Sequence, residues 1–377
     1  MSPKSDPEPR QPHLGAAQIR LLERLCNAVA VSGDEGEVRL LVLENVRPLA
    51  DEVSVDALGN VLAIRRARGE NASGQPPLRS PLRVMLAAHM DEVGFMLTND
   101  DGDGIFRFEL VGGLDERQLV GKPVWIGREH VPGVIGAKPI HLTTAEERKL
   151  AISLDSLRMD TGPGGNSKVK VGDRATFATT FTRLGPSLRA KALDDRLGVA
   201  TLIELLRHAP AHLDLMAAFT VQEEVGLRGA RVAAYAFNPD LAVAIDSTPA
   251  MDLPVWEREG SQPEENAHYN TRLDAGPAIY LADGYTLSDP RLVSHLVQTA
   301  EALGIPYQFR QPSNRGGTDA GAIHLSRAGI PSVSVSVPGR YAHTAAGLAR
   351  LSDWQNTFTL LHAALDRLPA DILAVER

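Results

Sequence analysis

The 377-residue chain has one cysteine, Cys26, so it can form neither an internal disulfide nor a zinc site built from thiolates. Cys26 stands in an apolar stretch with helical periodicity, which predicts a buried structural thiol. Any metal ion must therefore be held by histidine and carboxylate side chains.

Long apolar runs and an excess of basic residues are also missing. No run approaches the roughly 20 apolar residues of a membrane-spanning helix. The 39 lysines and arginines are outnumbered by 47 acidic residues, and binding to nucleic acid through bulk charge requires a basic face. We therefore expect a cytoplasmic protein that binds neither membranes nor nucleic acid.

The local patterns predict an α/β protein with an insertion. Residues 1–15 begin with a proline-rich polar stretch and are expected to be a disordered tail. Strands and helices alternate over 16–96 and 188–377, which predicts one domain with a central sheet and helices on both faces. Short, glycine-rich strand patterns over 97–187 predict an inserted small β-barrel.

Ionisable side chains follow several of the predicted strands, at the end of a sheet where α/β proteins bind ligands. These side chains are His89 with Asp91, Asp194 with Asp195, Glu223 with Glu224, Asp246, and His343. Each has a structural alternative when taken alone: either aspartate of the second pair could cap a helix, and the glutamate pair could be a solvated turn. Together they offer two imidazoles and several carboxylates, a donor set that suits a pair of divalent ions such as Zn or Co.

A site of this kind has a recognisable chemistry. Two metal ions clamp a carbonyl or phosphoryl group and lower the pKa of a bridging water, and one further carboxylate moves the proton.

Seven short motifs carry a family resemblance over about residues 18–368. They lie at 31–33, 56–60, 89–95, 191–198, 222–229, 316–320 and 340–343. In their order and spacing the chain resembles the tetrahedral aminopeptidases, also known as glutamyl or deblocking aminopeptidases, a family of dinuclear metallopeptidases whose members are often labelled endoglucanases.

The resemblance implies a role for each residue. His89 and His343 would each bind one metal ion, Asp194 would bridge the two, and Glu224 and Asp246 would each complete one coordination shell. Glu223 would be the general base that activates the bridging water, and Asp91 would hold the ring of His89. Asp195 is not assigned as a ligand, and the peptide bond between Asp194 and Asp195 is often cis in such enzymes.

The resemblance also implies a fold and an assembly. The catalytic domain would be phosphorylase/hydrolase-like, with a central mixed sheet, and the 97–187 barrel would mediate dimerisation. Dimers would assemble into a hollow dodecamer that admits short peptides. The polar segment 257–275 is longer than expected and could be a specificity or contact loop.

The expected function is a dinuclear metal-dependent aminopeptidase that hydrolyses N-terminal residues from short peptides. A metal-dependent deacylase or amidohydrolase of the same fold, and a non-catalytic assembly protein that kept the fold, are the alternatives. An endoglucanase is disfavoured, because its two carboxylates must flank a sugar, whereas the side chains of Glu223 and Glu224 diverge. A pocket for acidic residues would need a lysine or arginine; Arg196, Arg315 and Arg340 lie near motifs, but the sequence does not place them.

Overall fold

The computed structural model describes residues 12–68, 80–253, 271–312, 315–374 and 376. Most of the expected tail at 1–15, and the 257–275 segment up to residue 270, lie outside these described residues. No helix in the described part is long and apolar enough to cross a membrane.

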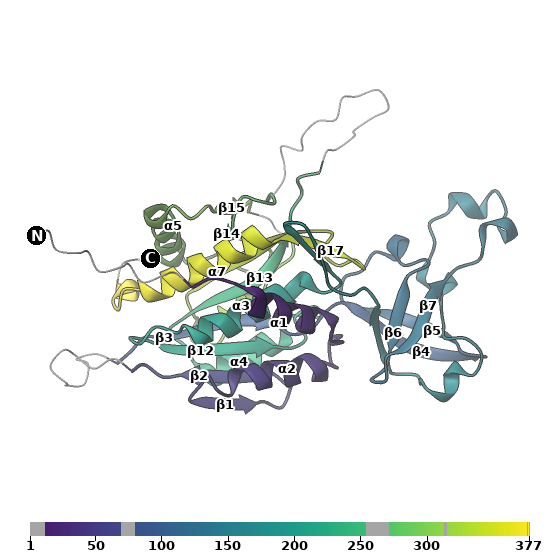
Figure 1. Ribbon diagram of the computed structural model, residues 1–377, viewed down its shortest axis with the longest axis horizontal. Coiled ribbons are helices and arrows are strands. Elements are labelled where there is room, and N and C mark those ends of the chain that lie inside the picture. The colour runs from purple at the N-terminus through teal and green to yellow at the C-terminus, as the bar shows by residue number, and fades with distance from the viewer. Residues whose placement is uncertain (1–11, 69–79, 254–270, 313–314, 375, 377) are drawn as a thin grey trace, which may run out of the picture.

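The protein consists of an α/β body with a β-barrel beside it, which confirms the predicted fold class (Figure 1). The body has one large mixed sheet in the order β1-β2-β12-β3-β13-β16-β17-β11-β10, and β14 joins β16 to β15. Its strands are β1 (Glu52–Val55), β2 (Val61–Arg65), β3 (Arg83–His89), β10 (Thr182–Leu184), β11 (Ser187–Ala190), β12 (Asp214–Thr220), β13 (Leu241–Pro249), β14 (Ala278–Tyr280), β15 (Gln308–Arg310), β16 (Ser332–Arg340) and β17 (Gly347–Arg350).

The centre of the sheet is parallel. Strands β12, β3, β13 and β16 pair with their neighbours in the same direction, so their carboxyl ends meet at one edge. Residues 84–89 of β3 are all buried, as expected for a strand that is covered on both faces.

Helices cover both faces of the sheet. The helices are α1 (Ala16–Asn27), α2 (Gly36–Val46), α3 (Leu193–Arg207), α4 (Arg228–Phe237), α5 (Pro290–Leu303), α6 (Ala320–Ile323) and α7 (Leu351–Asp366). Helices α1, α2, α3, α5 and α7 share one apolar core with the sheet, and α4 and α6 pack on the other face. Cys26 on α1 is fully buried, as predicted, and burial raises the pKa of its thiol to about 12.

Local chemistry sets the ends of the helices. Helix α5 begins where the Asp289 side chain accepts the N–H of Arg291 with Pro290 between them, and it ends at Gly304, whose φ is 63°. A longer helix over 319–327 is expected from the sequence, but that expectation is wrong. Helix α6 stops at Ile323, and left-handed residues at Arg327 and Gly329 turn the chain towards β16.

The barrel is closed and antiparallel, in the order β4-β5-β8-β7-β6-β9. Its strands are β4 (Gly94–Gly102), β5 (Ile105–Val111), β6 (Pro123–Ile126), β7 (Val131–Gly136), β8 (Arg158–Asp160) and β9 (Arg174–Phe177). It has its own apolar core, in which the Phe95 ring packs edge-on against Phe108 and Phe177. The domain boundaries at 97 and 187 stay a prediction; strand pairing places β10 and β11 in the large sheet rather than in the barrel.

Candidate metal centre

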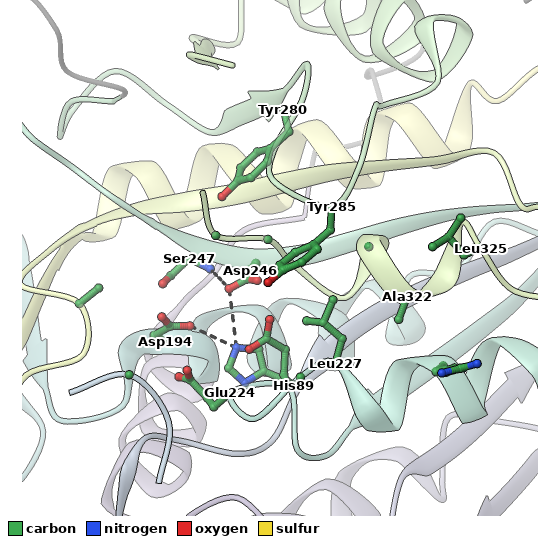
Figure 2. Close-up of a pocket in the computed structure, with 18 of the residues that line it drawn as sticks. His89, Asp194, Glu224, Leu227, Asp246, Ser247, Tyr280, Tyr285, Ala322 and Leu325 are labelled. Atoms are coloured by element: carbon green, nitrogen blue, oxygen red, sulfur yellow. Dashed lines mark hydrogen bonds and ion pairs between the residues drawn. The ribbon is translucent and has the colours of Figure 1, made fainter. Parts of the chain in front are cut away.

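The structure brings the predicted site residues together at the carboxyl edge of the parallel strands (Figure 2). They come from the end of β3, the start of α3, the turn after β12, β13, and the loop between β16 and β17. These residues are His89, Asp91, Asp194, Glu223, Glu224, Asp246 and His343.

Asp194 lies between the two imidazoles. Its Oδ1 is 3.2 Å from His89 Nε2, and its Oδ2 is 3.4 Å from His343 Nε2. Asp246 Oδ1 lies 3.7 Å from His89 Nε2, and Glu224 Oε2 lies 3.3 Å from His343 Nε2. Each imidazole nitrogen therefore faces the shared aspartate and one carboxylate of its own.

Asp91 supports the site from behind. Its Oδ1 lies 3.6 Å from His89 Nδ1, and its carbonyl oxygen lies 3.2 Å from the same nitrogen. The carboxylate also accepts the backbone N–H groups of Glu223 at 3.0 Å and Glu224 at 3.2 Å, and the Ser32 hydroxyl at 2.6 Å. One buried aspartate thus fixes the imidazole ring and the turn that carries both glutamates.

Asp195 points elsewhere, although it adjoins Asp194 through a cis peptide bond. Its Oδ1 accepts the N–H of Gly198 at 2.9 Å, which is the role of a helix cap. Its Oδ2 accepts the N–H of His89 at 3.3 Å. The side chain therefore anchors β3 to α3 and leaves Asp194 to face the imidazoles.

Burial makes this group of carboxylates electrostatically unfavourable without added positive charge. Burial and the neighbouring Asp194 raise the pKa of Glu224 to about 8, and burial together with nearby carboxylates raises the pKa of Glu223 well above its usual range. Burial opposes protonation of His343, but contact with Asp194 nevertheless raises its pKa to about 9.

The donor set fits divalent cations. Three groups of three side chains each place ligand atoms within 4.8 Å of one another: His89 with Asp194 and Asp246, Asp194 with Glu224 and His343, and His89 with Glu223 and Glu224. Imidazole nitrogens and carboxylate oxygens are suitable ligands for such ions, and a bound cation would compensate the buried negative charge.

The structure also contains a buried ion-pair cluster beneath the site, which the sequence did not predict. Glu92 contacts Lys191 Nζ at 2.5 Å and Arg196 Nη2 at 3.2 Å, and it accepts the Thr176 hydroxyl of the barrel at 2.8 Å. Arg196 is therefore committed to this cluster and does not serve the pocket. Lys191 and Arg196 flank Asp194 in the sequence, which is the signal that could have revealed a paired acidic residue.

The site opens into a cavity of about 1190 Å³. Neither Arg315 nor Arg340 is among the described residues that line it, and Arg340 pairs with Asp252 at 2.6 Å. Arg310, which sequence reasoning missed, does line the cavity. Arg310 comes at the end of a short strand pattern, and the same signal, an ionisable residue at the end of a predicted strand, identified His89.

Comparison with known proteins identifies the family of the chain. The sequence model of the M42 glutamyl aminopeptidase family matches residues 74–360 of the chain. The lysyl aminopeptidase of Pyrococcus furiosus is 32% identical, over 92% of this chain and 96% of that protein. A solved TET aminopeptidase from a Thaumarchaeota archaeon superposes with a TM-score of 0.84 at 31% identity, over 95% of this chain and 99% of its own. The TET1 peptidase of Pyrococcus horikoshii, described as assembling into a tetrahedron or a large octahedral shell, has a TM-score of 0.77 at 31% identity, over 93% of this chain and 100% of its own.

The imidazole and carboxylate donors at the carboxyl edge of this α/β sheet form a candidate metal centre, and the family match places the protein among the metal-dependent peptidases. With a match that spans 74–360, the chain belongs to the M42 glutamyl aminopeptidase family and is an aminopeptidase. The resemblance inferred from the sequence is thereby confirmed.

Proposed function

We propose that the protein holds two divalent ions and uses Glu223 as the general base to remove N-terminal residues from short peptides. The observation that carries this proposal is the placement of Asp194, with one carboxylate oxygen towards His89 and the other towards His343. A carboxylate in that position can serve two ions at once. Asp246 would complete the ligands on the His89 side, and Glu224 those on the His343 side.

Bound ions of this kind, with Zn or Co the best fit to nitrogen and oxygen donors, would polarise the scissile carbonyl and make water nucleophilic near neutral pH. The remaining work falls to the protein. Glu223 would take the proton of the attacking water and deliver it to the leaving amine, which a carboxylate with a raised pKa does well. Asp91 would keep the His89 ring and the Glu223 backbone in place.

The test is a metal count coupled to hydrolysis. Chelated protein should be inactive on leucyl and glutamyl p-nitroanilides, and Zn, Co or Mn should restore activity as two ions per chain are taken up. His343→Ala should bind fewer ions, whereas His141→Ala, at an exposed site on the barrel, should bind two. An inactive metal-free protein that no divalent ion restores would overturn the proposal. Cleavage of N-acyl amino acids in place of anilides would favour the deacylase alternative.

We also propose the division of the chain into a catalytic domain at 16–96 and 188–377 and a barrel at 97–187 that mediates assembly. The barrel has a separate core and lies beside the body (Figure 1), which supports the division. The described shell of the Pyrococcus horikoshii relative supports a large homo-oligomer, and a hollow dodecamer assembled from dimers would admit only short peptides.

A further inference from the structure

A bend of the β-barrel, formed by Gly112 and Gly113, lies against the candidate metal centre. Gly112 follows Val111, the last residue of β5, and Val111 pairs with Gly94, the first residue of β4. Gly94 comes shortly after His89 in the chain, so the strand register brings the bend to the metal centre. Gly113 is one of the residues that line its cavity.

The imidazole of His343 is hydrogen-bonded to this bend. Its Nδ1 lies 2.8 Å from the carbonyl oxygen of Gly113, and no other described residue hydrogen-bonds that nitrogen. A carbonyl oxygen can only accept, so Nδ1 carries the proton, and in a neutral ring this leaves the lone pair of Nε2 free. Nε2 is the atom that faces Asp194 and Glu224. The Gly113 carbonyl therefore sets the ring orientation and the tautomer that a metal ligand needs.

Gly112 packs against the other side chain on this half of the centre. A Cβ added to Gly112 would lie 3.3 Å from Glu224 Cβ and 2.8 Å from Val93 Cγ1. The φ angle of Gly112 is 85°, in the left-handed region that favours glycine. A larger residue at this position would therefore have to move the bend, and the Gly113 carbonyl would move with it.

The two imidazoles of the site are held in different ways. His89 is buried, and its Nδ1 is held by Asp91 from the same stretch of chain. The side chain of His343 is 39% exposed, and its loop has left-handed backbone at both Tyr341 and His343. The hydrogen-bond partner of its Nδ1 comes from the barrel. A change in the bend should therefore disturb the His343 half of the centre and spare the His89 half.

We infer that Gly112 and Gly113 are positioning residues, through which the barrel holds His343 and Glu224 in place for one of the two metal ions. This inference rests on the proposed function, which makes both side chains ligands. It gives the barrel a part in the metal centre in addition to the assembly proposed for it.

The first test is a zinc titration of the chelated protein in a calorimeter, which needs no turnover. Gly112→Ala should weaken the binding of one ion by roughly ten- to a hundredfold, the usual cost of disturbing a group that orients a metal ligand, and should leave the affinity for the other ion unchanged. Gly121→Ala is the matched control. Gly121 lies just before β6 and has a φ of 75°, but a Cβ added there meets nothing within 4 Å, so this variant should keep both affinities.

A double substitution shows which ion is affected. His343→Ala should take up one ion fewer than the wild type. Adding Gly112→Ala to it should leave the affinity for the remaining ion unchanged, because the imidazole that the bend positions is already gone. Gly113→Val tests the same contact without the strain of a positive φ. Its Cβ would lie 3.4 Å from His343 Nδ1, and its methyl groups would crowd the ring, so it should also weaken one ion.

The outcomes separate the inference from the proposed function. Unchanged affinity for both ions in Gly112→Ala and Gly113→Val would overturn the inference. Equal weakening of both ions would also overturn it, because the bend would then support the fold as a whole. A wild type that takes up fewer than two ions, or a His343→Ala variant that takes up as many as the wild type, would overturn the proposed function itself, and this inference with it.

Discussion

At the scale of single residues, Glu223 and Glu224 are neighbours of one type in different surroundings. Glu224 has an oxygen 3.3 Å from His343 Nε2, whereas the described residues form no ion pair with Glu223. Both backbone N–H groups are held by Asp91, so one fixed turn carries both side chains, and of the two only Glu224 forms an ion pair with His343 among the described residues. This difference leads to opposite expectations for the two substitutions.

Glu223→Gln should keep both ions and the fold but lower kcat by roughly a hundred- to ten-thousandfold, because it removes a general base. Glu224→Gln should instead weaken metal affinity, and excess metal should restore part of the activity. Elemental analysis and kcat at several metal concentrations distinguish the two variants. If Glu223→Gln lost metal while Glu224→Gln kept it, the assigned roles would be reversed.

Glu92 provides a second prediction at this scale. It compensates two buried cations, Lys191 and Arg196, so Glu92→Gln would leave them without an anion. We expect the free energy of unfolding to fall by about 3–5 kcal/mol in urea titrations. The control is Glu44→Gln, which breaks an exposed pair with Arg24 and should cost about 0–1 kcal/mol. Equal losses in the two variants would show that the buried cluster is not stabilising.

The chemistry of the site could be predicted from the sequence, but its electrostatic surroundings could not. His89, Asp194 and Glu224 stand out because each follows or begins an element whose apolar pattern is readable. Glu92 is next to Asp91 in the sequence, and no local sequence pattern indicates that its side chain faces away from the site. Its partners become visible only when β3, α3 and the barrel strand β9 are packed together.

At the scale of elements, Asp353 joins the first turn of α7 to the chain before β14. Its carboxylate accepts the N–H of Asp274 at 2.8 Å and the N–H of Gly276 at 2.9 Å. Burial nevertheless raises its pKa from the usual 3.8 to about 6. The folded state therefore binds a proton that the unfolded state has lost between these two values, and this contribution to stability disappears as pH rises through about 6.

Asp353→Asn isolates this titration, because asparagine stays neutral. The difference between the two free energies of unfolding, wild type minus variant, should decrease between pH 4 and pH 7 and then level off. Urea titrations of both proteins across that range measure it, and the metal centre, common to both, cancels in the difference. A difference that stays constant or rises with pH would contradict the proposed burial of this carboxylate.

The elements themselves could be predicted where the pattern is local. The buried run of β3 and the Asp289-Pro290 start of α5 are both readable from neighbouring residues. The order of the strands is not, because β2 pairs with β12 and β11 with β17 across more than a hundred residues. The prediction of a helix over 319–327 was wrong for a local reason. The apolar pattern favours a helix there, but the backbone at Arg327 is left-handed.

At the scale of the whole molecule, the barrel carries apolar side chains that its own core does not use. Ile140, Leu142 and Leu150, on the segment between β7 and β8, are 69%, 61% and 71% exposed. Exposed apolar side chains gathered in one segment typically mark a contact surface. The barrel is also the part that the family resemblance assigns to dimerisation, so we expect another copy of the chain to cover these side chains.

Leu142→Asp combined with Leu150→Asp should therefore reduce the size of the assembly in light scattering at micromolar concentration, because each buried carboxylate would lack a partner. The two substitutions lie outside the barrel core and far from the metal ligands in sequence, so small anilides should still be cleaved. Leu40→Asp on α2 is the matched control: Leu40 is 69% exposed but belongs to the α/β body, and its variant should keep the full assembly. If the wild type is monomeric, or if the barrel variant assembles as the control does, the barrel does not mediate assembly.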